Sequence, residues 1–365
     1  MATATKKRTN GIELAASDLK AALAAVSPAV PSRSQKPIYQ AVRLGDGVLT
    51  GSDGEVRIDV TIDYHGDAIL LPHGRLSQIL GAATGDTVTL QPGDTSCVVK
   101  AGSGTWTLPT ENAIEYQLWE PTDAKPVTRL PADQFVRAVR GTVYATDQKS
   151  SRFALGSVLM EVTDGNPTFV ATDGRRLSAV ETETDQAVDD SSTQIPAKAL
   201  GIMRDLAGGG SVQLEATKAE VICTTDAAVI TARLVDGRFP RWRDVFPERD
   251  VEASVLPVRD LEAAVRAAAV CTSEQSKGVV FNFGSVLTLT SQSAEAGQAS
   301  VTCDITTPGK AAKVKLDPRF VLDFLAGLDA DDEPHVEIEA AGPGDAVILK
   351  CGDVRGVIMP LAEDA

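Results

Sequence analysis

The sequence predicts an α+β protein built from three tandem copies of one domain with antiparallel sheets. Two observations predict this class: a hairpin motif recurs after 120 residues, and pairs of amphipathic helical segments recur on the same scale. Short Asp-Gly turns join alternating strands, which favours antiparallel pairing over crossover connections. With 365 residues and 43% apolar composition, the chain is long enough for two or three globular domains.

The hairpin motif is the clearest repeat. "LTGSDGEVRIDV" (49–60) and "FVATDGRRLSAV" (169–180) both read as strand, small residue, Asp-Gly turn and strand. A fainter third copy, "LTLTSQSAEAGQASVTC" (287–303), has a longer turn. Only the second copy follows its turn with two arginines, so turn chemistry explains the Asp-Gly pair and leaves Arg175 and Arg176 unexplained.

Six helical segments of two alternating kinds are predicted. The first kind has an aspartate followed by Leu or Phe, and then apolar residues at helical spacing. The second kind has a proline near its start, where the fixed φ of proline is tolerated. The first kind comprises 16–26, 131–143 and 257–270, and the second comprises 71–80, 195–206 and 316–325.

Two segments rich in proline and charge, 120–131 and 246–257, mark the predicted domain boundaries. We predict a disordered leader over 1–10 and domains over 11–125, 126–250 and 251–365. Each domain is expected to place two helices on one face of its sheets.

Composition excludes several classes of protein. No run of 18 apolar residues predicts a membrane span, and the charged, amphipathic segment after residue 10 is not a signal peptide. We therefore expect a cytoplasmic protein without membrane contact. The five cysteines are widely spaced and only three histidines occur, so we expect buried free thiols, no metal and no cofactor.

Motifs for catalysis are missing from the sequence. No phosphate-binding glycine loop, zinc-protease motif or nucleophile–histidine arrangement is present, and turns account for the Asp-Gly pairs. These observations disfavour an enzyme.

The net charge of −15 argues against nucleic-acid binding on average, but a local basic surface can coexist with an acidic exterior. Two predicted helices each carry a basic pair on one face, Arg137 with Arg140 and Arg259 with Arg266. Aspartates on the same helices keep an ordinary solvated face as the alternative.

Taken in order, the segments of the chain after about residue 11 resemble the bacterial β sliding clamp family, the processivity subunit of DNA polymerase III. The matching segments are 26–42, 107–118, 147–162, 169–181, 234–247, 267–281, 316–328 and 357–361. The resemblance implies three DNA-clamp domains with sheets outside and two helices per domain lining the inside. It also implies that the chain is half of a closed, head-to-tail homodimeric ring without catalytic activity. The implied partners are duplex DNA of any sequence, the replicative DNA polymerase, the clamp loader and other proteins with a clamp-binding motif.

The resemblance also implies site residues. Position by position, with the two helix-face arginines added, the candidate DNA contacts are Arg33, Arg137, Arg140, Gln148, Lys149, Arg152, Phe153 and Lys198. The candidate partner-peptide groove, between the second and third domains, is Leu155, Thr172, Gly174, Arg175, Arg176, Leu177, Pro240, Val245, Asp317, Phe320, Val357, Ile358, Met359, Pro360 and Leu361. The candidate ring seam is Leu76, Ile79, Leu108, Val270 and Cys271. Solvation of each lone basic residue, and plain core packing of the apolar ones, are the alternatives.

Two departures from the family pattern bear on the site. Arg175 stands where the family usually has histidine or tyrosine, and the acidic Glu363 and Asp364 are candidates to pair with it. Phe153 and Ala154 stand where the family often has two tyrosines. A clamp-like paralogue for repair, plasmid or phage replication remains one alternative function. An unrelated α+β enzyme that uses carboxylates is the other.

Overall fold

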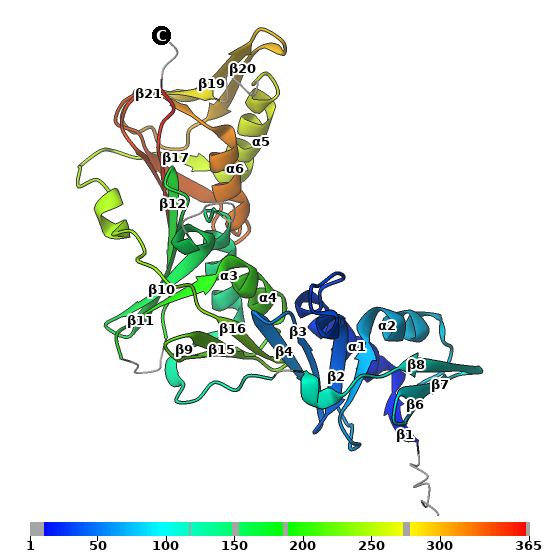
Figure 1. Ribbon diagram of the computed structural model, residues 1–365. Helices are drawn as coiled ribbons and strands as arrows, with labels where there is room; N and C mark the ends of the chain where they lie inside the picture. The colour runs from blue at the N-terminus through cyan, green and yellow to red at the C-terminus, as the bar shows by residue number, and fades with distance from the viewer. Residues whose placement is uncertain (1–10, 117, 148–152, 185–188, 273–277, 363–365) are drawn as a thin grey trace, which may run out of the picture. The chain divides into compact units, whose positions relative to one another are not determined.

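The computed structural model describes residues 11–116, 118–147, 153–184, 189–272 and 278–362 (Figure 1). The order of helices and strands is β-α-β-β-β-β-α-β-β-β, and this order occurs three times along the chain. The threefold order is consistent with three tandem domains, and the α+β prediction is confirmed.

The first repeat comprises β1 (Ile12–Ala15), α1 (Ala16–Val26), β2 (Ala41–Gly45), β3 (Val48–Ser52), β4 (Val56–Thr61), β5 (Ile69–Pro72), α2 (His73–Ala82), β6 (Thr87–Pro92), β7 (Ser96–Ala101) and β8 (Gly104–Pro109). The second comprises β9 (Lys125–Pro131), α3 (Ala132–Val143), β10 (Ser157–Thr163), β11 (Asn166–Thr172), β12 (Arg176–Glu181), β13 (Ser191–Pro196), α4 (Ala197–Asp205), β14 (Ser211–Ala216), β15 (Glu220–Thr224) and β16 (Val229–Arg233). The third comprises β17 (Ser254–Pro257), α5 (Val258–Ala269), β18 (Val279–Phe283), β19 (Val286–Ser293), β20 (Gly297–Asp304), β21 (Ala312–Leu316), α6 (Pro318–Gly327), β22 (His335–Glu339), β23 (Val347–Cys351) and β24 (Val354–Ile358). All six predicted helices are present.

The chain forms two compact units. The first unit holds residues 1–126 and 205–233, and the second holds 127–204 and 234–365. In the first unit one sheet has the order β1-β6-β7-β8, and in the other β5-β2-β3-β4 is followed by β16-β15-β14. Because β16 pairs with β4, strands of two successive repeats share a sheet. The predicted boundaries of the three domains stay a prediction.

The second unit repeats this arrangement. One sheet has the order β13-β10-β11-β12-β24-β23-β22-β17, and the other has the order β20-β19-β18-β21. The central junction is the antiparallel pair β12–β24, in which Leu177 lies opposite Val357. Strands of the second and third repeats therefore meet in the middle of one sheet.

The predicted hairpins form, and their turns are built alike. In both, an aspartate oxygen accepts the backbone N–H groups two and three residues later: Asp53 from Glu55 and Val56, and Asp173 from Arg175 and Arg176. The following glycine takes a positive φ, +92° at Gly54 and +87° at Gly174, which an L side chain rarely adopts. β19 and β20 form the third hairpin.

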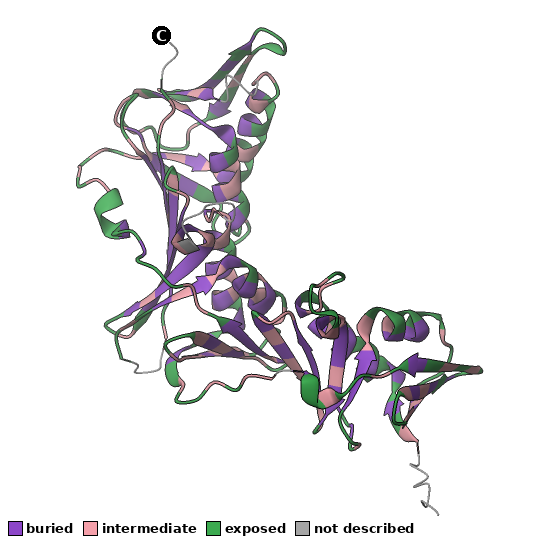
Figure 2. Ribbon diagram, viewed as in Figure 1, coloured by how far each residue is buried: buried purple, intermediate pink, exposed green. Residues whose placement is uncertain are grey.

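The helices cover one face of each sheet with their apolar sides. α1 packs on β3 and β4, α3 on β11 and β12, and α5 on β19 and β20. Figure 2 shows the buried residues gathered on the helix sides that meet the strands. Phe135 of α3 meets Phe169 of β11 edge to face, with ring centres 6.1 Å apart.

Four of the five cysteines, Cys97, Cys223, Cys303 and Cys351, are buried free thiols, as predicted, whereas Cys271 is half-buried. Within the described residues, no helix is long and apolar enough to cross a membrane.

Some predictions fall outside the described residues. They concern the leader 1–10, the predicted DNA contacts Gln148, Lys149 and Arg152, and the acidic Glu363 and Asp364.

Candidate functional site

An apolar cavity of about 490 Å³ opens in the second unit. It is lined by Leu155, Thr172, Gly174, Arg175, Arg176, Leu177, Pro240, Val245, Pro247, Arg249, Asp345, Ala346, Val357 and Met359. Ten of these residues are among the fifteen that the sequence resemblance assigns to a groove. We refer to this cavity as the groove.

The floor of the groove comes from strand alternation. On β12, Ser178 points to the helix side, where its hydroxyl donates to the Gly141 carbonyl oxygen at 2.5 Å. Its neighbour Leu177 therefore points to the other face, where it joins an apolar cluster with Val357 of β24. Both side chains are almost completely buried, so the floor is rigid.

One wall of the groove is the segment 234–247, which crosses this face of the sheet. Phe239 and Trp242 anchor the segment in the same cluster as Leu177. The Trp242 indole also donates to the Glu161 carboxylate at 3.2 Å and packs edge to face on Phe246. The anchored segment presents Pro240 and Val245 to the groove, and Val245 is 39% exposed.

The groove is also lined by four residues that the sequence did not predict. They are Pro247, Arg249, Asp345 and Ala346. The Arg249 guanidinium donates to the carbonyl oxygens of Ala346, at 2.7 Å, and Glu339, at 3.2 Å, and so ties the 249 region to the start of β23. This contact joins residues about 90 apart in sequence, and no local motif signals it.

Arg176 organises the rim of the groove. Its guanidinium pairs with Asp173 at 3.1 Å and Asp323 at 2.5 Å, and donates to the Tyr144 carbonyl oxygen at 2.6 Å. It also lies 4.5 Å from the centre of the Phe320 ring. One side chain thus joins the hairpin turn, the end of α3 and helix α6.

Five predicted groove residues do not line the cavity. Ile358 neighbours Val357 on the strand and is buried, because alternate side chains leave opposite faces of a sheet. Asp317 caps α6 by accepting the Arg319 N–H at 3.0 Å. Phe320 lies beneath the rim arginines. Pro360 and Leu361 follow the last groove residue, and the Leu361 N–H donates to the Lys315 carbonyl oxygen.

The predicted DNA contacts that can be described are on the surface or at a helix face. Arg33 and Lys198 are exposed, and Phe153 begins a short 3-10 helix. Arg137 pairs with Asp353 at 3.0 Å, and Arg140 donates to the Ala326 carbonyl oxygen at 3.1 Å. The second basic helix face is likewise paired, Arg259 with Asp331 and Arg266 with Glu262.

The seam candidates differ sharply in exposure. Val270, at the end of α5, is 74% exposed, while Leu76 is completely buried and Ile79 and Leu108 are each 7% exposed. Leu76 therefore offers no surface to a partner. Cys271 is half-buried.

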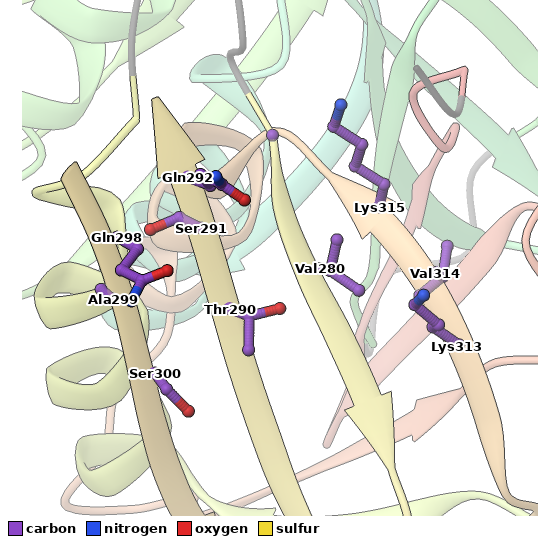
Figure 3. A pocket seen from close by; sticks show the side chains of 11 residues that line it. Val280, Thr290, Ser291, Gln292, Gln298, Ala299, Ser300, Lys313, Val314 and Lys315 are labelled. Atoms are coloured by element: carbon purple, nitrogen blue, oxygen red, sulfur yellow. The ribbon is translucent and has the colours of Figure 1, made fainter. Parts of the chain in front are cut away.

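A second hollow, of about 690 Å³, lies over the sheet of β18 to β21 (Figure 3). Its side chains are mainly hydroxyls, amides and two lysines, Lys313 and Lys315, and its lining contains no His, Cys, Asp or Glu. Ser291 borders the hollow, but its hydroxyl donates to the Ala268 carbonyl oxygen of α5, on the helix-covered face of this sheet. A polar face opposite a helix-covered face is typical of an antiparallel sheet, so this hollow is not a candidate active site.

Two buried cysteines and the search for metal-binding groups bear on possible chemistry in the described residues. Burial raises the pKa of the Cys223 thiol to about 12, and burial followed by the nearby Glu333 raises that of Cys351 to about 11, so neither is a thiolate at neutral pH. Within the described ranges, no group of three His, Cys, Asp or Glu side chains is placed to hold a metal ion.

Several known proteins are similar to this chain. The family model described as "DNA polymerase III beta subunit, central domain" matches residues 129–241. The curated "Beta sliding clamp" of Synechococcus elongatus is 25% identical over 94% of this chain and 97% of its own length. That of Escherichia coli K12 is 24% identical over 80% of this chain and 82% of its own.

Taken together, these comparisons support a bacterial β sliding clamp. Solved clamp structures share its fold: a DNA polymerase sliding clamp from Bacillus subtilis has a TM-score of 0.89 at 20% identity, and covers 96% of this chain and 99% of its own. Clamps of this family are non-catalytic processivity factors of DNA replication, so the prediction of a protein without catalysis is confirmed.

Proposed function

We propose that two copies of this chain close head to tail into a ring around duplex DNA and that the groove holds short peptides of partner proteins. The replicative polymerase and the clamp loader are the expected partners. The observation that carries the proposal is the convergence of ten predicted groove residues, from positions 155 to 359, on one apolar cavity. An apolar pocket with a rigid floor and polar rim suits a peptide anchored by a few apolar side chains.

The proposed hold on DNA is topological and needs no tight contact. A closed ring leaves DNA only by opening or by reaching an end, and attraction of phosphates by arginine is independent of sequence. The helix-face arginines Arg137, Arg259 and Arg266 each share their charge with a carboxylate. Their electrostatic attraction for DNA is therefore weak, which favours sliding over fixed binding. The net charge of −15 disfavours DNA binding elsewhere on the surface.

The proposed seam uses two open sheet edges. Within the described residues, β8 pairs only with β7, and β20 pairs only with β19. β8 carries no charge and β20 carries one, Asp304 at its end, although natural proteins usually protect a free edge with charged side chains. We propose that β8 of one protomer lies beside β20 of the other, with the exposed Val270 close by. Two such contacts related by a twofold axis close a ring.

Retention on circular DNA tests the ring directly. The purified clamp is loaded by its clamp loader onto nicked circular DNA, which is separated from free protein by gel filtration. We expect the clamp to elute with the circle in high salt and to be lost after a restriction enzyme linearises the DNA. Equal retention on circular and linear DNA would show ordinary binding and contradict encirclement.

Met359→Asp is expected to weaken peptide binding at least tenfold. Met359 lines the groove and is 44% exposed, so the fold tolerates the change while the carboxylate lies in an apolar pocket. Fluorescence polarisation with a labelled peptide ending in Leu-Phe measures the affinity. Val286→Asp is the matched control, because Val286 is 41% exposed and lies outside the groove. Equal affinities of the two variants would contradict the groove.

A further inference from the structure

The charges around the groove are unequally compensated. Arg176 is engaged by the carboxylates of Asp173 and Asp323. Arg249 is engaged by two backbone oxygens, and its guanidinium lies 4.0 Å from the Glu339 carboxylate. Among the described residues, the Arg175 guanidinium pairs with no carboxylate. Within the described part of the chain, no carboxylate offsets this positive charge at the rim of the groove.

Arg175 is held in place at its backbone. Its N–H donates to Asp173 Oδ1 at 2.9 Å, and its carbonyl oxygen accepts from the Met359 N–H at 2.9 Å. Its guanidinium lies 5.4 Å from the centre of the Phe320 ring. A guanidinium over an aromatic ring uses its face, and the N–H groups at its edge stay available. These donors match the two oxygens of a carboxylate.

The positive charge is confined to one side of the groove. Sheet order places β12, β24 and β23 side by side, with Arg175, Met359 and Ala346 at the same end of the three strands. Arg175 and Ala346 are thus separated by two strand spacings, roughly 10 Å. The side of the groove that contains Ala346 also contains the exposed Asp345 and Arg249. The negative charge of Asp345 and the positive charge of Arg249 therefore offset each other on that side. Among the described residues of the groove, the cation without a carboxylate partner therefore lies on the side of Arg175.

We propose that Arg175 makes this groove selective for partner peptides that carry a carboxylate next to their apolar anchor. This inference rests on the proposed function of the groove and adds the chemistry of its partner. A peptide aspartate or glutamate gains a charge-assisted bond from Arg175, whereas a lysine at that position is repelled.

The test compares charged and neutral peptides on the full chain. The probes are fluorescein-labelled hexapeptides ending in Leu-Phe, with aspartate at each of the four other positions in turn, and the matching asparagine peptides. We expect one position at which aspartate binds about tenfold tighter than asparagine, since a hydrogen bond to a charged group contributes that much. The preference should shrink between 50 and 500 mM salt.

Two variants test whether Arg175 causes the preference for aspartate over asparagine peptides. Arg175→Gln should lower it to less than twofold while asparagine peptides bind as before. Arg129→Gln is the matched control, because Arg129 is also exposed in the second unit but lies outside the groove, and it should keep the full preference. A preference that survives Arg175→Gln, or equal binding of both peptides to the original chain, overturns this inference and leaves the groove standing. Failure of every peptide to bind overturns the groove itself and this inference with it.

Discussion

Val270→Arg is expected to convert the dimeric clamp into monomers and to abolish its retention on circular DNA. Val270 is the most exposed of the five seam candidates, at 74%, and follows directly on α5. Because ring closure repeats each contact twice, one substitution places two unpaired guanidinium groups in apolar surroundings. Light scattering coupled to gel filtration should fall from the mass of two chains, about 76.6 kDa at 38.3 kDa each, to that of one.

Ile114→Arg is the control for this effect. Ile114 is 89% exposed, is not a seam candidate, and should leave the dimer intact. Salt gives a second, independent check. Since Asp304, at the end of β20, is the single charged residue of β8 and β20, dissociation should change little between 0.1 and 1 M salt, where contacts based on ion pairs weaken. A Val270→Arg chain that keeps the mass of a dimer would place the seam elsewhere.

Arg176→Met is expected to lower the free energy of unfolding by about 3 kcal/mol, because removing one partner of a buried ion pair leaves the other charge uncompensated. The side chains of Arg176 and Asp173 are only 11% and 9% exposed. The substitution also removes the bond to the Tyr144 carbonyl oxygen and the contact with Phe320. Methionine keeps much of the apolar volume, so the measured loss reports mainly on the polar contacts.

Urea denaturation followed by Trp242 fluorescence measures this loss, in a background with Trp106→Phe and Trp119→Phe. Trp242 is then the single tryptophan and reports on the core beneath the groove. Arg175→Met, one residue earlier and exposed, should change the free energy by less than about 0.5 kcal/mol. Similar losses in both variants would show that the Arg176 network does not stabilise the unit.

Local sequence signals predicted the elements well. Helical spacing located all six helices, because each buries one apolar side against a sheet, and Asp-Gly located the hairpins, because Asp53 and Asp173 each accept two turn amides. The pairing of β4 with β16 and of β12 with β24 carried no such signal. Those pairs depend on which free edges meet after each repeat has formed, and no short segment encodes that.

The groove residues likewise divide into those that a local sequence signal identifies and those that depend on long-range contacts. Alternation along β24 separates Val357, on the floor, from Ile358, and an Asp-Pro helix start explains the role of Asp317 as a cap; both could have been read from the sequence. The contribution of Asp345 and Ala346 depends on the register of β23 against β24, and that of Arg249 on a bond to a distant carbonyl oxygen. The pairing of Arg137 with Asp353, 216 residues away, could likewise not be predicted from the sequence.

The pairing of β12 with β24 has a consequence for the making of the protein. Leu177 is synthesised long before Val357, yet the groove floor needs both. A ribosome that has completed only two repeats holds a chain with half a floor and an open strand edge. If the groove holds partner peptides as proposed, competence to recruit a partner arises only after the last strand of the third repeat has been made, and incomplete translation products do not compete with finished clamps for those partners.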